Sequence, residues 1–110
     1  GDMNENSFMV QLGWFTPQEI ITARQEQGVV GDLAGYSFFN IQGTPVDTVM
    51  NNRVIGLSLE QLRAIPCVIA IASESTKATA ILGALRTGVI DVLATSASNA
   101  RTVIHLHKAL

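Results

Sequence analysis

An aspartate and a lysine are the side chains whose positions in this sequence suggest chemistry. Asp32 lies in the apolar run "VVGDL", where an ionised carboxylate has to be paired or has to open onto a cleft. Lys77 lies in "IASESTKATAI", where an apolar run ends and a helix begins. A cation at an exposed helix start opposes the helix dipole by about 0.3–1 kcal/mol, so its presence there calls for a reason. Because a carboxylate accepts hydrogen bonds from hydroxyls and a lysine binds oxygen-rich groups, the two residues predict a site for a polar ligand.

Residues beside this pair strengthen the prediction. Gly31 has no side chain and would let a ligand approach the backbone closely. The loop of residues 73–76, which includes Ser73 and Glu74, follows an apolar run and opens a helix. Such a junction directs backbone N–H groups towards any anion placed there. We therefore expect Gly31, Ser73 and Glu74 to belong to the same ligand-binding site.

Ordinary structural roles remain open for both charged residues. Asp32 could cap the turn at Gly35, as short carboxylates often do. Lys77 could be a solvated lysine paired with Glu74 three residues earlier, an interaction worth a few tenths of a kcal/mol. Similarly, Tyr36, Phe38 and Phe39 could stack on a ligand, or could alternate between the two faces of a hairpin.

Capping residues and terminating glycines indicate the helices that must position the site. Two helices begin with capping boxes, in which Ser or Thr is followed three residues later by Glu or Gln: Thr16 with Glu19, and Ser58 with Gln61. A third helix has Ser73 or Ser75 as its N-cap and Gly88 as its terminator. A last helix runs from about Ser98 to the end of the chain.

Apolar runs between these helices predict the strands. The runs at 67–72 ("CVIAIA") and 89–95 ("VIDVLAT") are typical of strands buried on both faces of a parallel sheet. With the intervening helices they form a βαβα pattern, which indicates an α/β fold. Residues 29–48 predict a strand that leads into a hairpin, and 52–57 ("NRVIGL") predict another short strand. Such fully apolar strands need more covering layers than this chain supplies, so we expect it to be part of a larger sheet.

Composition and charge exclude several classes of function. The chain has 110 residues, enough for one small domain, and a net charge of −2, so it lacks the basic face of a nucleic-acid-binding surface. A single cysteine excludes an internal disulfide and suits a cytoplasmic location. The apolar runs are too short to span a membrane. His105 and His107 are two residues apart and would point to different sides of a helix, so we expect neither a metal site nor a cofactor.

Several of these segments resemble a known family when they are read in order. The segments are "GVVGDLAGYSFFNIQGTPVD", "NRVIGLSLEQLRAIPCVIAIA" and "KATAILGALRTGVIDVLAT", followed by "NA". Over about residues 12–100 they resemble the effector-binding domain of SorC/DeoR-type bacterial sugar-responsive transcriptional regulators. The resemblance implies a doubly wound, mostly parallel sheet similar to the sugar-phosphate isomerase/deaminase (NagB/RpiA-like) fold. It also implies that residues 1–110 are the C-terminal portion of that domain, without its first half and without the DNA-binding helix-turn-helix.

The resemblance further implies a function and partners. The effector would be a sugar or sugar phosphate, with Asp32 matching a sugar-hydroxyl ligand and Lys77 matching an anion or hydroxyl contact. Effector binding would control operator DNA through the absent N-terminal domain, in an oligomer that is usually a tetramer, and without catalysis. Where the family usually has two glycines, this chain has Ser73 and Glu74, which crowd a phosphate and add a like charge. We therefore expect an unphosphorylated sugar, or a phosphate held elsewhere.

Two other functions stay open from the sequence alone. A sugar-phosphate isomerase or deaminase would need a general base with a positioned partner, and the segment offers Asp32 and Glu74 without a histidine near either in sequence. A structural or oligomerisation module without a ligand of its own is the third possibility.

Overall fold

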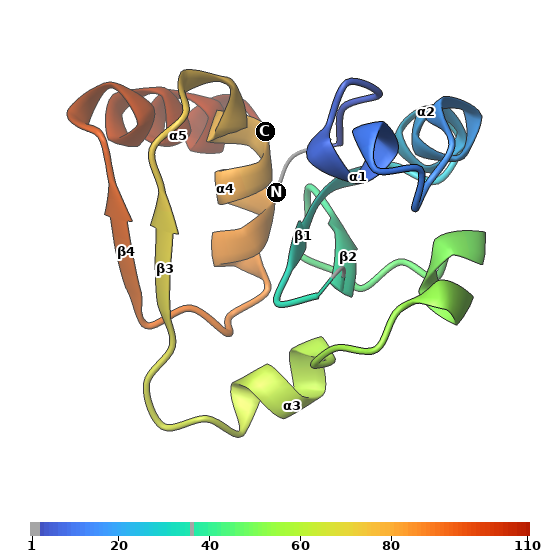
Figure 1. Cartoon of the computed structure of the whole chain (residues 1–110). Helices are drawn as coiled ribbons and strands as arrows, with labels where there is room; N and C mark the ends of the chain where they lie inside the picture. Colours follow the sequence, from blue (N-terminus) through green and yellow to red (C-terminus); the bar gives the residue numbers. More distant parts are fainter. Residues whose placement is uncertain (1–2, 36) are drawn as a thin grey trace.

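The computed structural model describes residues 3–35 and 37–110, and it arranges two pairs of strands around a central helix, α4 (Figure 1). The hairpin β1–β2 lies on one side of α4 and the pair β3–β4 on the other, with α5 at the end of the latter pair (Figure 1). The elements in chain order are α1 (Phe8–Gln11), α2 (Pro17–Gln25), β1 (Val29–Leu33), β2 (Ser37–Asn40), η1 (Val49–Arg53), α3 (Leu59–Arg63), β3 (Ile69–Ala72), η2 (Ser75–Lys77), α4 (Ala78–Arg86), β4 (Val92–Thr95) and α5 (Ala97–Ala109).

The two predicted capping boxes are confirmed. At the start of α2, the backbone N–H of Glu19 donates to Thr16 Oγ1 at 3.2 Å, and the backbone N–H of Thr16 donates to Glu19 Oε2 at 3.0 Å. Ser58 and Gln61 exchange the same two hydrogen bonds at the start of α3. Each box satisfies N–H groups that a helix start otherwise leaves without partners, which is why these helices begin where the sequence indicates.

The predicted N-cap of α4 is wrong. Neither Ser73 nor Ser75 caps the helix; Ser75 opens the short 3-10 turn η2, and α4 follows with Lys77 at its N-cap position and no side-chain cap bond. The last helix begins at Ala97, with Ser96 Oγ accepting from the backbone N–H of Asn99 at 3.1 Å. Helix α4 thus begins directly after a 3-10 turn and, like α1, has no side-chain cap.

Strands β3 and β4 pair in parallel, as predicted, with Ile69 opposite Val92 and α4 in the crossover between them. Burial on both faces was predicted for a larger sheet of which this chain would be a part, and within the described residues one face is covered and the other is open. Ala72 and Leu93 pack against the core formed by α4 and α5. The opposite face is open, because Ile69, Ile71 and Val92 are 62%, 81% and 48% exposed. Parallel sheets are normally covered on both faces, so this face is unusual for a parallel pair.

The hairpin β1–β2 is antiparallel and contains a β-bulge. Val29 lies opposite Asn40 while Gly31 lies opposite Phe39, so one extra residue is inserted in β1. Phe38 and Phe39 are both buried and belong to different core clusters on opposite faces of the hairpin, which confirms the alternation expected for them. Tyr36, the third aromatic residue considered as a stacking group, lies outside the described residues.

Helix α4 packs closely on this hairpin because it has a glycine at the contact. A Cβ atom added to Gly83 would lie 2.7 Å from Val30 Cγ2 and 2.9 Å from both Asn40 O and Phe39 Cε2. Glycine within a helix costs about 1 kcal/mol relative to alanine. The close packing of α4 on the hairpin requires glycine here in spite of this cost. This contact fixes the distance between α4 and β1, the two elements from which a ligand site would be built.

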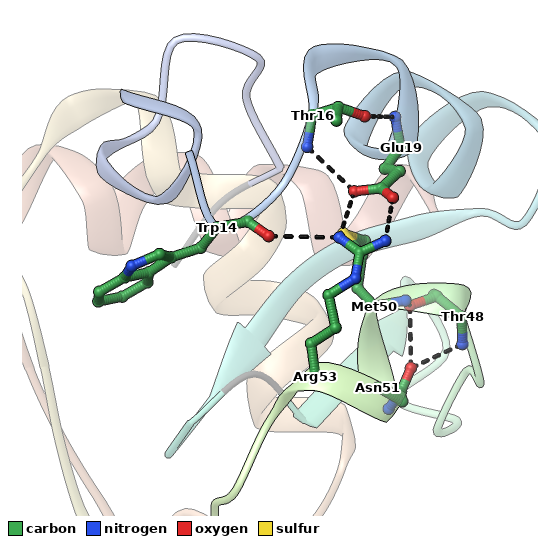
Figure 2. A network of polar contacts seen from close by, with 7 residues as sticks. All are labelled: Trp14, Thr16, Glu19, Thr48, Met50, Asn51 and Arg53. Carbon is green, nitrogen blue, oxygen red and sulfur yellow. Dashed lines mark hydrogen bonds and ion pairs between the residues drawn. The ribbon is translucent and has the colours of Figure 1, made fainter. Parts of the chain in front are cut away.

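The short strand predicted at 52–57 is wrong. Residues up to Arg53 form the 3-10 helix η1, which Thr48 and Asn51 cap, and residues 54–57 form no helix or strand. Figure 2 shows the polar network that holds this segment: Arg53 donates through Nη1 to Glu19 Oε2 at 2.7 Å, through Nη2 to Glu19 Oε1, and to the carbonyl of Trp14 at 3.3 Å. The segment is therefore held against α2 by the side chain of Arg53, and not by pairing with another strand.

Glu19 serves two elements at once in this network, and its acidity reflects this. Hydrogen bonds from Arg53, followed by the bond from the Thr16 backbone, lower the pKa of Glu19 from 4.5 to about 2. The carboxylate is therefore charged at any pH at which the chain is expected to work, and it joins α2 to η1.

Candidate ligand-binding site

A hollow lies between the hairpin, α4 and the β3–β4 pair, and both residues singled out by the sequence border it. Its walls are apolar apart from these two, which are Asp32 and Lys77. The apolar lining comes from β1 and β2 (Leu33, Phe39), from β3 and β4 (Ala70, Ile71, Ala72, Leu93), from α4 (Ala80, Ile81, Ala84) and from Ile90. An apolar hollow with a few polar groups is the usual form of a small-molecule site.

Asp32 reaches the hollow from the bulged strand β1. It is 7% exposed, and its atom Oδ1 is buried. In the hairpin it lies opposite Phe38, whereas Leu33 and Phe39 line the hollow from the other face. Residues opposite one another in an antiparallel pair share a face, so the side chain of Asp32 lies on the hairpin face that carries Phe38, although the residue is among those that line the hollow.

Lys77 reaches the hollow from the start of α4. Its side chain is only 23% exposed, and Nζ lies 3.2 Å from Glu74 Oε2. The ordinary pairing with Glu74 considered from the sequence is therefore present, but Lys77 is not a fully solvated lysine. Both descriptions hold together: Lys77 lines the hollow, and its ammonium group is paired with a carboxylate of its own loop.

The other predicted site residues do not line the hollow. Gly31 is buried within β1, and Ser73 and Glu74 are exposed. The side chain of Glu74 is 68% exposed and does not line the hollow, but it is paired with Lys77, which does. The structure thus brings Asp32 and Lys77 to one hollow and leaves Gly31 and Ser73 outside its lining.

A buried asparagine beside the site was missed by the sequence reasoning. Asn99 is 2% exposed, and its amide nitrogen Nδ2 donates to the carbonyl of Glu74 at 3.0 Å and to Thr95 Oγ1 at 3.1 Å. Thr95 in turn donates to the carbonyl of Ala72 at 2.5 Å. The sequence feature that could have indicated Asn99 is its place in the first turn of α5, three residues after the N-cap Ser96.

The described residues contain neither a metal-ligand cluster nor a membrane-spanning helix. Within the described residues, no three His, Cys, Asp or Glu side chains are grouped as a metal ion would require. His107 Nδ1 instead lies 3.2 Å from Arg86 Nη2. In the same part of the chain, no helix combines the length and the apolar character needed to cross a bilayer.

Comparison with known proteins gives a consistent result. The family model Sugar-bind, described as "Putative sugar-binding domain", matches residues 1–105. The transcriptional regulator LsrR of Escherichia coli O139:H28 is 38% identical over 79 residues, which are 71% of this chain and 25% of LsrR. This chain thus spans about a quarter of the length of the curated relatives it matches. The LsrR relative is a transcriptional regulator, which supports the regulator hypothesis over the isomerase alternative.

Two solved structures have the same fold as this chain. A Vibrio fischeri structure described as "Putative Sugar-Binding Domain of Transcriptional Repressor" is 59% identical with a TM-score of 0.88, and the match covers 98% of this chain and 43% of that one. The full-length sorbitol operon regulator SorC from Klebsiella pneumoniae is 31% identical with a TM-score of 0.71, over 79% of this chain and 28% of SorC. These similarities confirm the resemblance to SorC-type regulators. Because the family model covers nearly all of its residues, the chain belongs to the Sugar-bind family of sugar-binding domains.

Proposed function

We propose that the hollow bordered by Asp32 and Lys77 is the sugar-binding site of this chain. The observation that carries the proposal is that these two residues, far apart in the sequence, border the same largely apolar hollow. A sugar has hydroxyls that need hydrogen-bond partners and C–H faces that pack on apolar surface, and this lining offers both. Lys77 would donate to ring or hydroxyl oxygens from the α4 side. Asp32 would accept a hydrogen bond from a sugar hydroxyl on the β1 side.

The charges around the hollow favour a neutral sugar over a sugar phosphate. Asp32 and Lys77 border the hollow, and Glu74 is paired with Lys77 at 3.2 Å, so two carboxylates accompany one ammonium group. A phosphate dianion would have to compete with Glu74 for Lys77 and would face the charge of Asp32. Neutral hydroxyls meet no such repulsion. We therefore expect an unphosphorylated sugar as the preferred ligand of these residues.

The site would serve as the sensor of a longer regulatory protein. The chain spans 25% of LsrR and 43% of the Vibrio fischeri domain, and the open face of β3–β4 suits a place within a larger, doubly wound sheet. In such a protein, the chain would be the C-terminal portion of the effector domain, and operator DNA would be bound elsewhere. The protein would act in the cytoplasm as a homo-oligomer and without catalysis, and the sugar would act by binding one arrangement more tightly than another.

Titration of the isotope-labelled chain by NMR tests the proposed site. The ligands are D-sorbitol, D-fructose and D-glucose, each alone and as its 6-phosphate. We expect at least one neutral compound to shift the amide signals of residues 70–77 saturably, and Lys77→Ala to abolish the shifts. The matched control Lys108→Ala removes an exposed lysine of α5 and should change nothing. If none of the six compounds moves these signals, the chain is a structural module as far as these sugars are concerned, and the proposal fails.

A further inference from the structure

The loop that presents Lys77 is anchored to the rest of the fold chiefly through one side chain. The carbonyl of Glu74 accepts two hydrogen bonds, one from Asn99 Nδ2 at 3.0 Å and one from the backbone N–H of Lys77 at 3.3 Å. The side chain of Asn99 and the backbone N–H of Lys77 therefore share the Glu74 carbonyl as their acceptor. As Asn99 is 2% exposed, water competes little for these bonds.

Asn99 joins this loop to a second set of contacts at the end of the parallel strands. Its amide also donates to Thr95 Oγ1 at 3.1 Å, and Thr95 donates to the carbonyl of Ala72 at 2.5 Å. Ala72 is the last residue of β3 and Thr95 the last residue of β4. Both hydrogens of one amide group thus connect the ends of two strands with the loop that carries Lys77.

The geometry points to Asn99 as the positioning residue of the ligand loop, a role that rests on the proposed sugar site. Helix α4 lacks a side-chain cap, so its first residues are not fixed in the usual way. Asn99 supplies the missing support from α5 by holding the Glu74 carbonyl, and this holds the Lys77 backbone at the hollow. Loss of the amide would remove one of the two hydrogen bonds that the Glu74 carbonyl accepts and would free the loop to move.

A matched pair of variants separates this role from a purely structural one. Asn99→Ala removes the bonds to Glu74 and Thr95. Ser96→Ala removes the cap bond from the backbone N–H of Asn99 at the start of α5 and keeps the side-chain amide of Asn99. Hydrogen exchange of backbone amides, measured on the complete chain, needs no ligand and therefore stays decisive even if the sugar site is wrong.

We expect Asn99→Ala to speed exchange at residues 76–80 at least tenfold, while Ser96→Ala speeds exchange in the first turn of α5 and leaves residues 76–80 unchanged. For any sugar that binds the wild type in the titration above, Asn99→Ala should weaken binding at least tenfold and Ser96→Ala less than twofold. Should Asn99→Ala fold poorly, Asn99→Asp keeps the size, favours the helix start and still lacks the donors. Equal exchange patterns in the Asn99 and Ser96 variants, or unchanged exchange at 76–80 after loss of the amide, would overturn the inference.

Discussion

Lys77 and Glu74 form an ion pair at the mouth of the hollow, with Nζ 3.2 Å from Oε2. The lysine is mostly buried and the glutamate mostly exposed, so the pair lies at the boundary between the hollow and solvent. The cation that opposes the dipole of α4 is thus compensated in part by its own loop. A ligand must either share Lys77 with Glu74 or displace it.

This arrangement predicts how Glu74 sets the preference between ligands. Glu74→Gln removes the competing charge and keeps the size of the side chain, so we expect the affinity for a sugar 6-phosphate to rise about tenfold relative to that for the neutral sugar. Calorimetric titration with D-sorbitol and its 6-phosphate measures the ratio. Glu60→Gln, an exposed carboxylate of α3, serves as the control. An unchanged ratio in Glu74→Gln would show that the loop charge does not select the ligand.

The second prediction concerns acid stability and the Glu19–Arg53 pair. Because the pKa of Glu19 is lowered from 4.5 to about 2 in the folded chain, its contribution to stability is fully present above about pH 4.5 and is lost as the pH falls towards 2. Glu19→Gln retains a capping-box residue but loses the charge. It should therefore cost about 0.2–1 kcal/mol of unfolding free energy at pH 7 and clearly less near pH 2, where about half of the carboxylate is protonated.

Urea denaturation of the wild type and Glu19→Gln at several pH values between 7 and 2 measures this difference. Glu26→Gln, a change of the same kind at the other end of α2, controls for the general loss of negative charge. A difference between wild type and Glu19→Gln that stays constant down to pH 2 would contradict the assignment of the ion pair.

The third prediction concerns the contact between α4 and the hairpin. Gly83→Ala improves helix propensity by about 1 kcal/mol, yet its new methyl group would lie 2.7 Å from Val30 Cγ2 and 2.9 Å from Asn40 O. Overpacking of this kind costs about 1–3 kcal/mol, so a net loss of stability is expected. Thr79→Ala, an exposed position of the same helix, should be neutral or stabilising. Thermal unfolding of both variants and the wild type measures the change in stability. A Gly83→Ala chain that is more stable than the wild type would refute the close packing.

The sequence predicted the elements where local chemistry determines them. The capping boxes at Thr16 and Ser58 act through bonds between near neighbours, so the residue pattern alone locates the helix starts. The parallel pairing of 67–72 with 89–95 likewise followed from the apolar runs and the helix between them. The Lys77–Glu74 pair could be foreseen because its members are three residues apart on one turn.

The predictions from the sequence are wrong where contacts between residues remote in sequence determine the local structure. Segment 52–57 has the apolar character of a strand, but Arg53 is fixed by Glu19 and Trp14, which are remote in sequence. The N-cap predicted at Ser73 or Ser75 is wrong because the 3-10 turn η2 precedes α4, and the hydrogen bond that reaches this loop from Asn99 comes from another helix. The bulge in β1, which sets the face on which Asp32 lies, leaves no mark in the alternation of a five-residue strand.

The central prediction is that a sugar binds at the hollow shared by Asp32 and Lys77. Calorimetric titration of the wild-type chain, Lys77→Ala and Asp32→Asn with the neutral sugar that binds best measures this, with circular dichroism to confirm that each variant is folded. We expect saturable binding by the wild type and at least tenfold weaker binding by each variant, which is about 1.4 kcal/mol or more. Wild-type affinity in both folded variants would contradict this prediction.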